Sequence, residues 1–473
     1  MLFNSFAYIF VLLPVAVSGY FLLSRGRRST SSRYLLVAVS LIFYIYGGLY
    51  YLPFLLVSIM VNYGTGRGIL RYGETGKAGA ARGLLTCGII LNVLFLGVFK
   101  YADFFIANIN ALVHSGIAPL KLIMPLAISF YTFQQIAYLV DCYRGDAHKS
   151  SLMDYCLFVT FFPQMIAGPI LRQREMMPQF EQAAQTRVEY RNLSLGLTIF
   201  SLGLVKRVVI ADTFGLWADA GFTAGASYTF IEAWITSLSY TFQIYFDFSG
   251  YTDMAIGSAY FFNIKLPFNF DSPYKALNIQ DFWRRWHITL SRFLRDYIYI
   301  PLGGNRRGEA RIYSNILITF LIGGIWHGAG WTFVLWGALH GLASVIHRIW
   351  HKWGIRLPKL LAGFITFNFI NIAWVFFRAE SIRDALHVLG AMFGLTVLSG
   401  GELFESISGK QQNFSWLILV ISVVTVFCMK NTNSIPERFQ PTRWRLAYQV
   451  ALILLGLLFL NSMMPREFIY FDF

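Results

Sequence analysis

The chain has 473 residues, of which 56% are hydrophobic and 18% aromatic, while only 13% are charged. Soluble domains carry about 25% charged residues, so this composition excludes an ordinary globular cytosolic protein. The net charge of +15 is spread over short gaps between apolar stretches, a pattern that favours a membrane protein and argues against a nucleic-acid binder.

Apolar stretches recur along the whole chain. A helical crossing needs about 20 apolar residues, which leaves room for roughly ten to twelve crossings and no large soluble domain. The predicted stretches are residues 5–24, 34–50, 51–66, 84–105, 121–140, 152–170, 193–220, 228–246, 312–347 (long enough for two segments), 360–377, 386–399, 414–429 and 446–463. Prolines, glycines or charges inside 152–170 and 193–220 predict re-entrant or interfacial segments there. We therefore expect an all-α polytopic membrane protein with a single domain over residues 1–473.

Charge placement predicts the orientation of the chain. The first apolar stretch is followed by the basic run RGRR at 25–28. A cleaved signal peptide has the opposite charge order, so we expect a retained first span that enters from the outside. Residues 263–311 form the longest polar stretch, with nine Lys and Arg against four acids. We predict that this stretch is a cytoplasmic-side amphipathic or re-entrant segment.

Two polar islands interrupt apolar stretches. The segment QIYFDFSGYTDMAIG, 243–257, contains Asp247 and Asp253. These carboxylates suit either a broken transporter helix or a helix end at which they cap the helix or pair with the basic cytoplasmic stretch. The segment 129–145 also carries polar residues near one end, and we expect them to hold the scaffold together.

The segment DFWRRWHITLSRFLRDY, 281–297, predicts a basic amphipathic helix. At about 100° per residue, its large apolar side chains share one face and its arginines the opposite one. His287 falls inside the apolar stripe. Because a buried imidazole needs partners, His287 is either a packing residue or a working one.

The segment GGIWHGAGWTFVLWGALHG, 323–341, places His327 in a long stretch without carboxylates. An ionisable group at membrane depth is costly, so a functional role is the first hypothesis and a hydrogen-bonded structural histidine is the alternative. The surrounding glycines predict either close helix packing or a break in the helix. On one continuous helix, His340 and His347 would lie roughly opposite His327, and we interpret both as structural or interfacial.

Other chemistries have little support in the sequence. No HExxH motif or acidic cluster indicates a metal, no GxSxG motif indicates a serine nucleophile, and the four cysteines show no paired spacing. A neutral imidazole that acts as general base on a hydroxyl requires none of these. We therefore expect neither a metal nor a permanently bound cofactor.

Taken together, these segments resemble the membrane-bound O-acyltransferase family, and within it the bacterial branch of alginate O-acetyltransferases. The similar stretches are SFYTFQ at 129–134, DCYRG at 141–145, FFPQMIAGPI at 161–170, DFSGYTDMAIG at 247–257, DFWRRWHITLSRFLRDYIYIPLGG at 281–304, GIWHGAGWTFVLWGALHG at 324–341 and AWVFFRAES at 373–381. The resemblance covers nearly the whole chain.

The resemblance implies about eleven membrane helices around a central tunnel, in the bacterial inner membrane. It implies that His327 is catalytic and that His287 supports it. Acetyl-CoA would be the acyl-donor substrate, held by Arg284, Arg285, Arg292, Arg295 and Trp326. The acetyl group would pass outward to a periplasmic partner with a serine-hydrolase-like fold (the SGNH type), which modifies a polysaccharide such as alginate, cellulose or peptidoglycan.

Three alternatives remain open at this point. A proton-coupled transporter or flippase would use Asp247 and Asp253 as coupling carboxylates. A membrane scaffold would only recruit a soluble transferase. A relative that transfers D-alanyl groups to teichoic acid would keep the acyl chemistry but change the donor and the acceptor.

Overall fold

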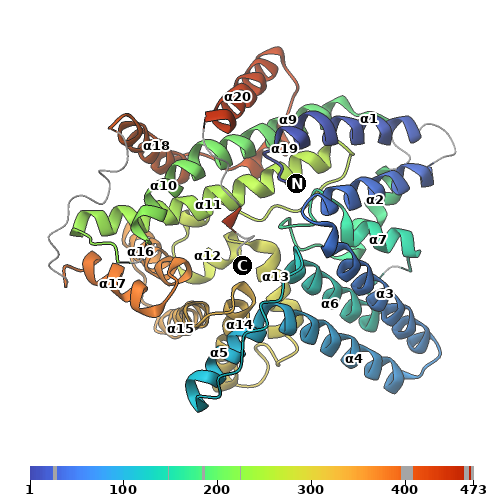
Figure 1. The fold of residues 1–473 in the computed structure, drawn as a ribbon, viewed down its shortest axis with the longest axis horizontal. Helices are drawn as coiled ribbons and strands as arrows, with labels where there is room; N and C mark the ends of the chain where they lie inside the picture. The colour runs from blue at the N-terminus through green and yellow to red at the C-terminus, as the bar shows by residue number, and fades with distance from the viewer. Residues whose placement is uncertain are drawn as a thin grey trace. The chain divides into compact units, whose positions relative to one another are not determined.

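The computed structural model describes residues 1–24, 29–147, 149–183, 187–223, 225–395, 409–462 and 468–469. Throughout these ranges every regular element is helical (Figure 1), which confirms the all-α prediction. The basic run at 25–28 lies outside the described residues. The contacts divide the chain into two compact units, and the predicted single domain over 1–473 stays a prediction.

The first unit comprises Met1–Ser201, Tyr251–Pro267 and Gln440–Gln449. Its helices and short helical turns are η1 (Tyr8–Leu12), α1 (Leu13–Leu23), α2 (Ser29–Ile45), η2 (Leu49–Tyr51), α3 (Leu52–Glu74), α4 (Ala78–Leu96), η3 (Gly97–Tyr101), α5 (Ala102–Val113), α6 (Ile128–Arg144), α7 (Leu152–Thr160) and α8 (Gln173–Ala183). Three further helices contribute residues to both units, namely α9 (Tyr190–Val205), α11 (Phe230–Tyr260) and α20 (Arg443–Ser462).

Helices α3, α4 and α6 pack on one another in this unit (Figure 1). The amides of Asn62 on α3 and Asn92 on α4 bond reciprocally, with N–O distances of 3.2 and 2.6 Å. Gly66 lets α3 approach the ring of Tyr138 on α6, because a Cβ there would lie 2.4 Å from the ring. Small residues and paired amides hold helices together where lipid supplies no hydrophobic drive.

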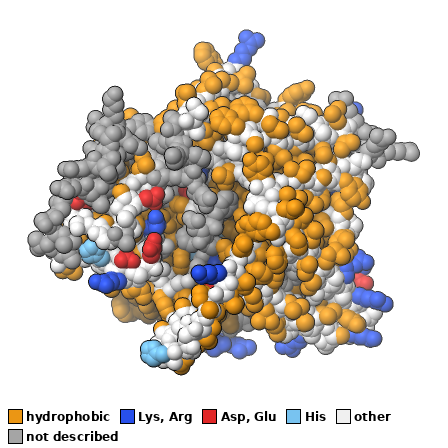
Figure 2. Space-filling model, in the orientation of Figure 1, with side chains coloured by type: hydrophobic (Ala, Val, Ile, Leu, Met, Phe, Trp, Pro, Cys, Tyr) orange, Lys and Arg blue, Asp and Glu red, His pale blue; other side chains and the backbone are white. Residues whose placement is uncertain are grey.

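The outer face of the first unit is apolar. Figure 2 shows hydrophobic side chains over its helices, with charged groups near the edge. Large exposed apolar side chains include Val15, Leu22, Val57, Met60, Ile90 and Val93. Such a surface is unfavourable in water and suits the hydrocarbon of a bilayer.

The second unit comprises Leu202–Gly250, Phe268–Phe439 and Val450–Phe473. Its elements are η4 (Lys206–Ala211), α10 (Asp212–Gly221), η5 (Pro273–Lys275), α12 (Ile279–Arg285), α13 (Ile288–Leu294), η6 (Arg295–Tyr299), α14 (Glu309–His327), α15 (Trp331–Lys352), α16 (Lys359–Arg378), α17 (Ile382–Met392), α18 (Gly409–Cys428), η7 (Thr432–Ser434) and α19 (Ile435–Arg438).

A buried ion cluster lies in the second unit. Arg207 contacts Asp247 with an N–O distance of 2.7 Å and also pairs with Asp212, and all three side chains are buried. The Ile469 backbone N–H donates to the second oxygen of Asp247, at 3.0 Å. Asp247 therefore pairs with a buried arginine of the neighbouring helical segment, and not with the basic stretch 263–311 as one sequence interpretation required.

Membrane-crossing helices are present by length and composition. Four qualify among the described residues: Ala78–Val113, Tyr190–Gly221, Lys359–Arg378 and Arg443–Asn461. Two bent pairs, Thr30–Ile45 with Leu49–Glu74 and Trp416–Cys428 with Thr432–Arg438, raise the number to as many as six. The protein is therefore a membrane protein, while the count of about eleven stays a prediction.

The predicted continuous helix over 281–297 is wrong. The segment forms α12 and α13, with Trp286 and His287 between them, followed by the π-helical turn η6. The amphipathic pattern nevertheless holds, because Trp283, Trp286, Leu290, Phe293 and Leu294 are all buried. The stretch 312–347 does contain two helices, α14 and α15.

Candidate active site

His327 is the last residue of α14, and three residues, Gly328 to Gly330, turn the chain into α15. Its imidazole is buried. Aromatic rings surround it edge-on, with centroid distances of 4.9 Å to Trp326, 5.1 Å to Trp336 and 5.1 Å to Phe377. The imidazole therefore lies among aromatic rings.

Glycines bring α14 and α15 together beside His327 (Figure 1). A Cβ on Gly324 would lie 2.4 Å from the Phe333 carbonyl oxygen, and one on Gly337 would lie 2.5 Å from the Phe320 carbonyl oxygen. This approach seats Trp336, next to Gly337, against His327. The sequence left close packing and a helix break as alternatives, and the structure contains both.

The break at His287 gives this residue an unusual backbone. His287 has φ of 41°, in the left-handed region, and it caps α13. The Asn269 side chain receives hydrogen bonds from the backbone N–H and the hydroxyl of Thr289, at 3.2 and 2.7 Å. A non-glycine residue held in this region by its surroundings is often found at a functional site.

The His287 side chain is fully buried, with Phe248 edge-on at 4.7 Å. Neither ring nitrogen has a hydrogen-bond partner among the described residues. The centroid of the Trp326 ring is 6.3 Å from that of His287 and 4.9 Å from that of His327, so this indole lies between the two histidines. The structure thus gathers three of the sequence-predicted site residues.

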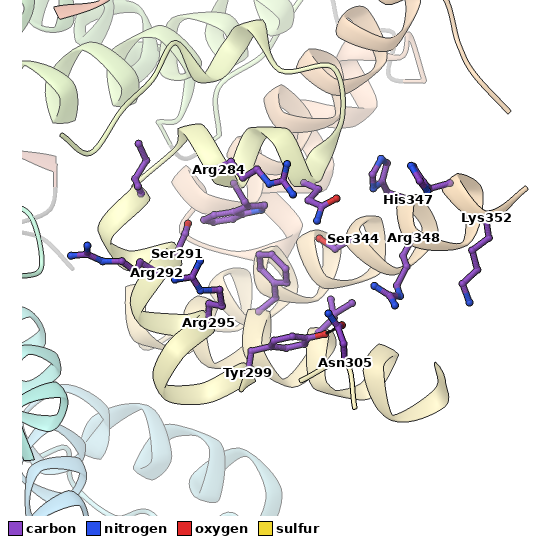
Figure 3. A pocket seen from close by; sticks show the side chains of 16 residues that line it. Arg284, Ser291, Arg292, Arg295, Tyr299, Asn305, Ser344, His347, Arg348 and Lys352 are labelled. Carbon is purple, nitrogen blue, oxygen red and sulfur yellow. Dashed lines mark hydrogen bonds between the residues drawn. The ribbon is translucent and has the colours of Figure 1, made fainter. Parts of the chain in front are cut away.

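A cavity of about 780 Å³ adjoins this region, between α12–η6 and the end of α15 (Figure 3). Its size is that of a typical small-molecule site. Three of the four predicted arginines line it, and two cations that the sequence analysis missed join them from α15. The cations are Arg284, Arg292, Arg295, Arg348 and Lys352, and His347 and His351 lie beside them. The basic cavity, as we call it, therefore suits a polyanion.

Some of these cations already have partners. Asp296 receives hydrogen bonds from Arg295 at 2.7 and 3.1 Å. Glu309 contacts Lys352 at 2.7 Å and Arg348 at 3.6 Å. The hydrogen bond from Lys352 holds the pKa of Glu309 below its usual value. In Figure 3, Arg292 extends away from α15.

Arg285 lies apart from the basic cavity. It forms an ion pair with Asp281, one helical turn earlier, at 2.8 Å, and it is not among the residues that line the cavity. The sequence predicted all four arginines on one face of a single helix. The helix breaks at Trp286 and His287, so Arg285 points elsewhere than the other three. Asp281 lies four residues before Arg285, a spacing that favours an ion pair on a helix, and this pattern could have distinguished Arg285 from the three other arginines.

A chain of aromatic residues joins the basic cavity to His327. Trp283 lines the cavity, and its indole N–H donates to Nδ1 of the buried His340, at 3.2 Å. The His340 ring lies 4.6 Å from Trp336, which contacts His327. The angle between His340 and His327 that one continuous helix would give does not apply, because α14 ends at His327 and α15 begins at Trp331.

Known proteins resemble this chain over half of its length or more. Residues 142–379 match the model of the membrane-bound O-acyltransferase family. A peptidoglycan O-acetyltransferase of Helicobacter pylori is 46% identical, over 100% of this chain and 98% of the relative. The probable alginate O-acetylase AlgI of Pseudomonas aeruginosa is 39% identical, over 91% of this chain and 82% of the relative.

A more distant relative is the teichoic acid D-alanyltransferase of Bacillus subtilis, 29% identical over 55% of this chain and 70% of the relative. The matched family region contains the break at His287, the end of α14 at His327 and the basic cavity. The chain therefore belongs to the membrane-bound O-acyltransferase family and is an O-acyltransferase.

Proposed function

We propose that this enzyme takes an acetyl group from cytoplasmic acetyl-CoA and passes it across the bacterial inner membrane, for O-acetylation of an extracytoplasmic polysaccharide. The observation that carries the proposal is the connection, within one compact unit, between a cation-lined cavity and an enclosed histidine. Trp283, His340 and Trp336 form that connection.

The basic cavity is the proposed donor site. Coenzyme A carries phosphates on its nucleotide end, and Arg284, Arg292 and Arg295 would bind them through charge-assisted hydrogen bonds. Arg348 and Lys352 extend the same lining. The acyl thioester would then extend along Trp283 towards Trp326 and His327. No bound cofactor is required, because acetyl-CoA is a substrate.

The proposed chemistry is acyl transfer to a hydroxyl. The acceptor oxygen attacks the thioester carbonyl carbon while His327 takes the hydroxyl proton. The tetrahedral intermediate re-forms its C=O bond and breaks the C–S bond, and the thiolate leaves with the proton from His327. His287, on the other side of Trp326, would position the reacting groups. The proposed role requires a neutral His327 imidazole, which can accept the proton.

The relatives' names support the proposed class of acceptor. Two of them act, by name, on peptidoglycan and alginate, and the first of these matches this chain over its full length. Peptidoglycan is therefore the first acceptor to test. A tunnel within about eleven membrane helices would bring acceptor and donor together, and a periplasmic hydrolase-like partner would complete the transfer to the glycan.

The test is His327→Ala in cells, with ester-bound acetate released from purified cell-wall glycan by mild base. We expect the variant to lose more than 95% of the ester at equal protein level, since a general base contributes about 10²–10⁴-fold. The control is His114→Asn, at an exposed histidine of the first unit. Retention of half the ester in His327→Ala would overturn the proposal.

A second measurement separates transfer from transport. Purified protein with its partner receives acetyl-CoA labelled in the acetyl group. We expect thioester loss and labelled acceptor, whereas a transporter that used Asp247 and Asp253 would leave the thioester intact. Arg284→Ala should raise KM for acetyl-CoA with little change in kcat. Arg285→Ala, which breaks the ion pair with Asp281 outside the basic cavity, is the matched control.

A further inference from the structure

Four buried N–H groups, one of them on Trp336 in contact with His327, have no hydrogen-bond acceptor among the residues that the structure describes. They are Nε1 of Trp336, Nε2 of His340, Nδ2 of Asn371 and Nε1 of Trp374. Each side chain is at least 99% buried. We call these four residues the donor cluster.

Contacts join the members of the donor cluster. The Trp336 ring stacks on Trp374 with a centroid distance of 5.7 Å, and its centroid lies 4.6 Å from that of the His340 ring. Asn371 is one helical turn before Trp374 on α16. The connection to His327 runs through Trp336, whose ring is 5.1 Å from the imidazole.

Hydrogen bonds at two members fix which groups act as donors. His340 Nδ1 accepts from Trp283, so the neutral imidazole carries its proton on Nε2. The Asn371 amide oxygen accepts from the Thr241 hydroxyl at 2.6 Å, which leaves the amide NH₂ as the unpaired group. All four unpaired atoms are therefore donors, and none of the four is cationic.

Unpaired buried donors are rare in folded proteins, because each one costs about 1–3 kcal/mol unless it finds a partner. What distinguishes these four donors is that three of them belong to rings in mutual contact and the fourth lies one helical turn away, which suits an electron-rich oxygen bound at this place during function. A neutral cluster of N–H groups is the arrangement that stabilises an oxyanion in acyl transfer.

We propose that the indole N–H groups of Trp336 and Trp374 bind the acyl carbonyl oxygen and form the oxyanion hole of this enzyme. This inference rests on the proposed acyl transfer at His327. When the acceptor oxygen attacks the carbonyl carbon, the C=O electron pair moves onto the carbonyl oxygen, and the two N–H groups bind the resulting negative charge. The pair returns to re-form C=O as the C–S bond breaks, and the N–H groups keep their protons throughout.

The experiment replaces each indole by a ring that lacks the N–H group. Trp336→Phe and Trp374→Phe are purified with the partner protein, and kcat and KM for acetyl-CoA are measured. Removal of one oxyanion donor lowers kcat by about 10²–10³-fold, so we expect losses in this range with KM changed less than three-fold. A purely structural role would instead lower the thermal midpoint and the amount of folded protein.

Two further variants keep the test decisive. Incorporation of 3-benzothienylalanine at position 336 replaces the N–H by sulfur and preserves ring shape, so a fall in kcat cannot come from a packing defect. Trp234→Phe is the matched control, because its N–H already donates to the Met392 carbonyl at 3.0 Å. That control should keep its kcat.

The outcomes separate the two proposals. If His327→Ala abolishes transfer while Trp336→Phe and the benzothienyl variant keep kcat within three-fold of the unchanged enzyme, the oxyanion hole is overturned and the proposed function stands. If His327→Ala keeps full activity, the proposed function itself fails. A kcat loss in both position-336 variants, with normal thermal midpoints, supports the inference.

Discussion

Gly324→Ala tests whether the close contact of α14 and α15 positions the candidate active site. A Cβ at this position would lie 2.4 Å from the Phe333 carbonyl oxygen and 3.1 Å from the Gly337 Cα. Cβ atoms in proteins essentially never approach another heavy atom below 3.0 Å. The distance from the new Cβ to the Phe333 carbonyl oxygen must therefore grow from 2.4 Å to at least 3.0 Å, which moves the helices apart by about 0.6 Å. The atoms concerned belong to the backbone of α15, which cannot rotate away as a flexible side chain would.

Two opposing terms set the expected size of the effect. Replacing glycine by alanine inside a helix gains about 1 kcal/mol, while overpacking of a close contact costs about 1–3 kcal/mol. The net change in unfolding free energy should therefore be a loss of up to about 2 kcal/mol. A misplacement of about 1 Å can cost 10²-fold in rate, so a 0.6 Å shift should lower kcat by roughly ten-fold.

The assay compares acetyl transfer and thermal unfolding in detergent. The matched control is Gly64→Ala on α3, where a Cβ would meet no atom within 4 Å. This control should be as stable as the unchanged protein or more so, with full activity. If Gly324→Ala matched Gly64→Ala in both rate and thermal midpoint, the argument that glycine packing positions Trp336 and His327 would be refuted.

Three further predictions concern other polar contacts. Arg207→Met leaves two buried carboxylates without their shared cation, and should cost about 3–5 kcal/mol of unfolding free energy, measured by thermal unfolding; an unchanged midpoint would contradict the ion cluster. Asn92→Ala leaves the amide oxygen of Asn62 without its donor and should lower the free energy of unfolding by about 1–3 kcal/mol, whereas leucine at both positions should restore most of that loss. Glu309→Gln frees Lys352 for a ligand and should tighten CoA binding at pH 7, as measured by titration calorimetry. Because the pKa of Glu309 is depressed, its pairing is complete above the ordinary glutamate pKa and is lost as pH falls through the lowered value, so the advantage should shrink below about pH 4. An advantage that did not change with pH would contradict this assignment.

Much of the fold could be predicted from local pattern. The all-helical class follows from long apolar stretches, and the buried side of α12 and α13 follows from the spacing of Trp283, Leu290 and Phe293. The break at His287 could not be predicted from periodicity, because tertiary contacts stabilise it. Asn269, eighteen residues earlier, receives hydrogen bonds from Thr289 and replaces the helical bonds that the break removes.

The candidate site was predictable in its residues and only partly in its arrangement. His287 and His327 were conspicuous as ionisable groups in apolar surroundings, and the motifs around them identified the family. The contribution of Arg348 and Lys352 to the basic cavity depends on how α15 folds back on α14, which the glycines permit but do not specify. The place of His340 could not be predicted for the same reason, since the angle between it and His327 depends on whether one helix or two cover this stretch.

The separation of charge in this unit bears on the proposed mechanism. Cations line the basic cavity, whereas the rings that contact His327 are those of Trp326, Trp336 and Phe377, and Trp336 carries an unpaired N–H group. A cation beside His327 would oppose the imidazolium that forms when the hydroxyl proton is taken, and it would lower the basicity of the histidine. Neutral N–H donors stabilise the negative carbonyl oxygen without this penalty. The proposed enzyme would therefore bind the donor phosphates with arginines at one end of the Trp283–His340–Trp336 connection, and would stabilise the transition state with neutral dipoles at the other.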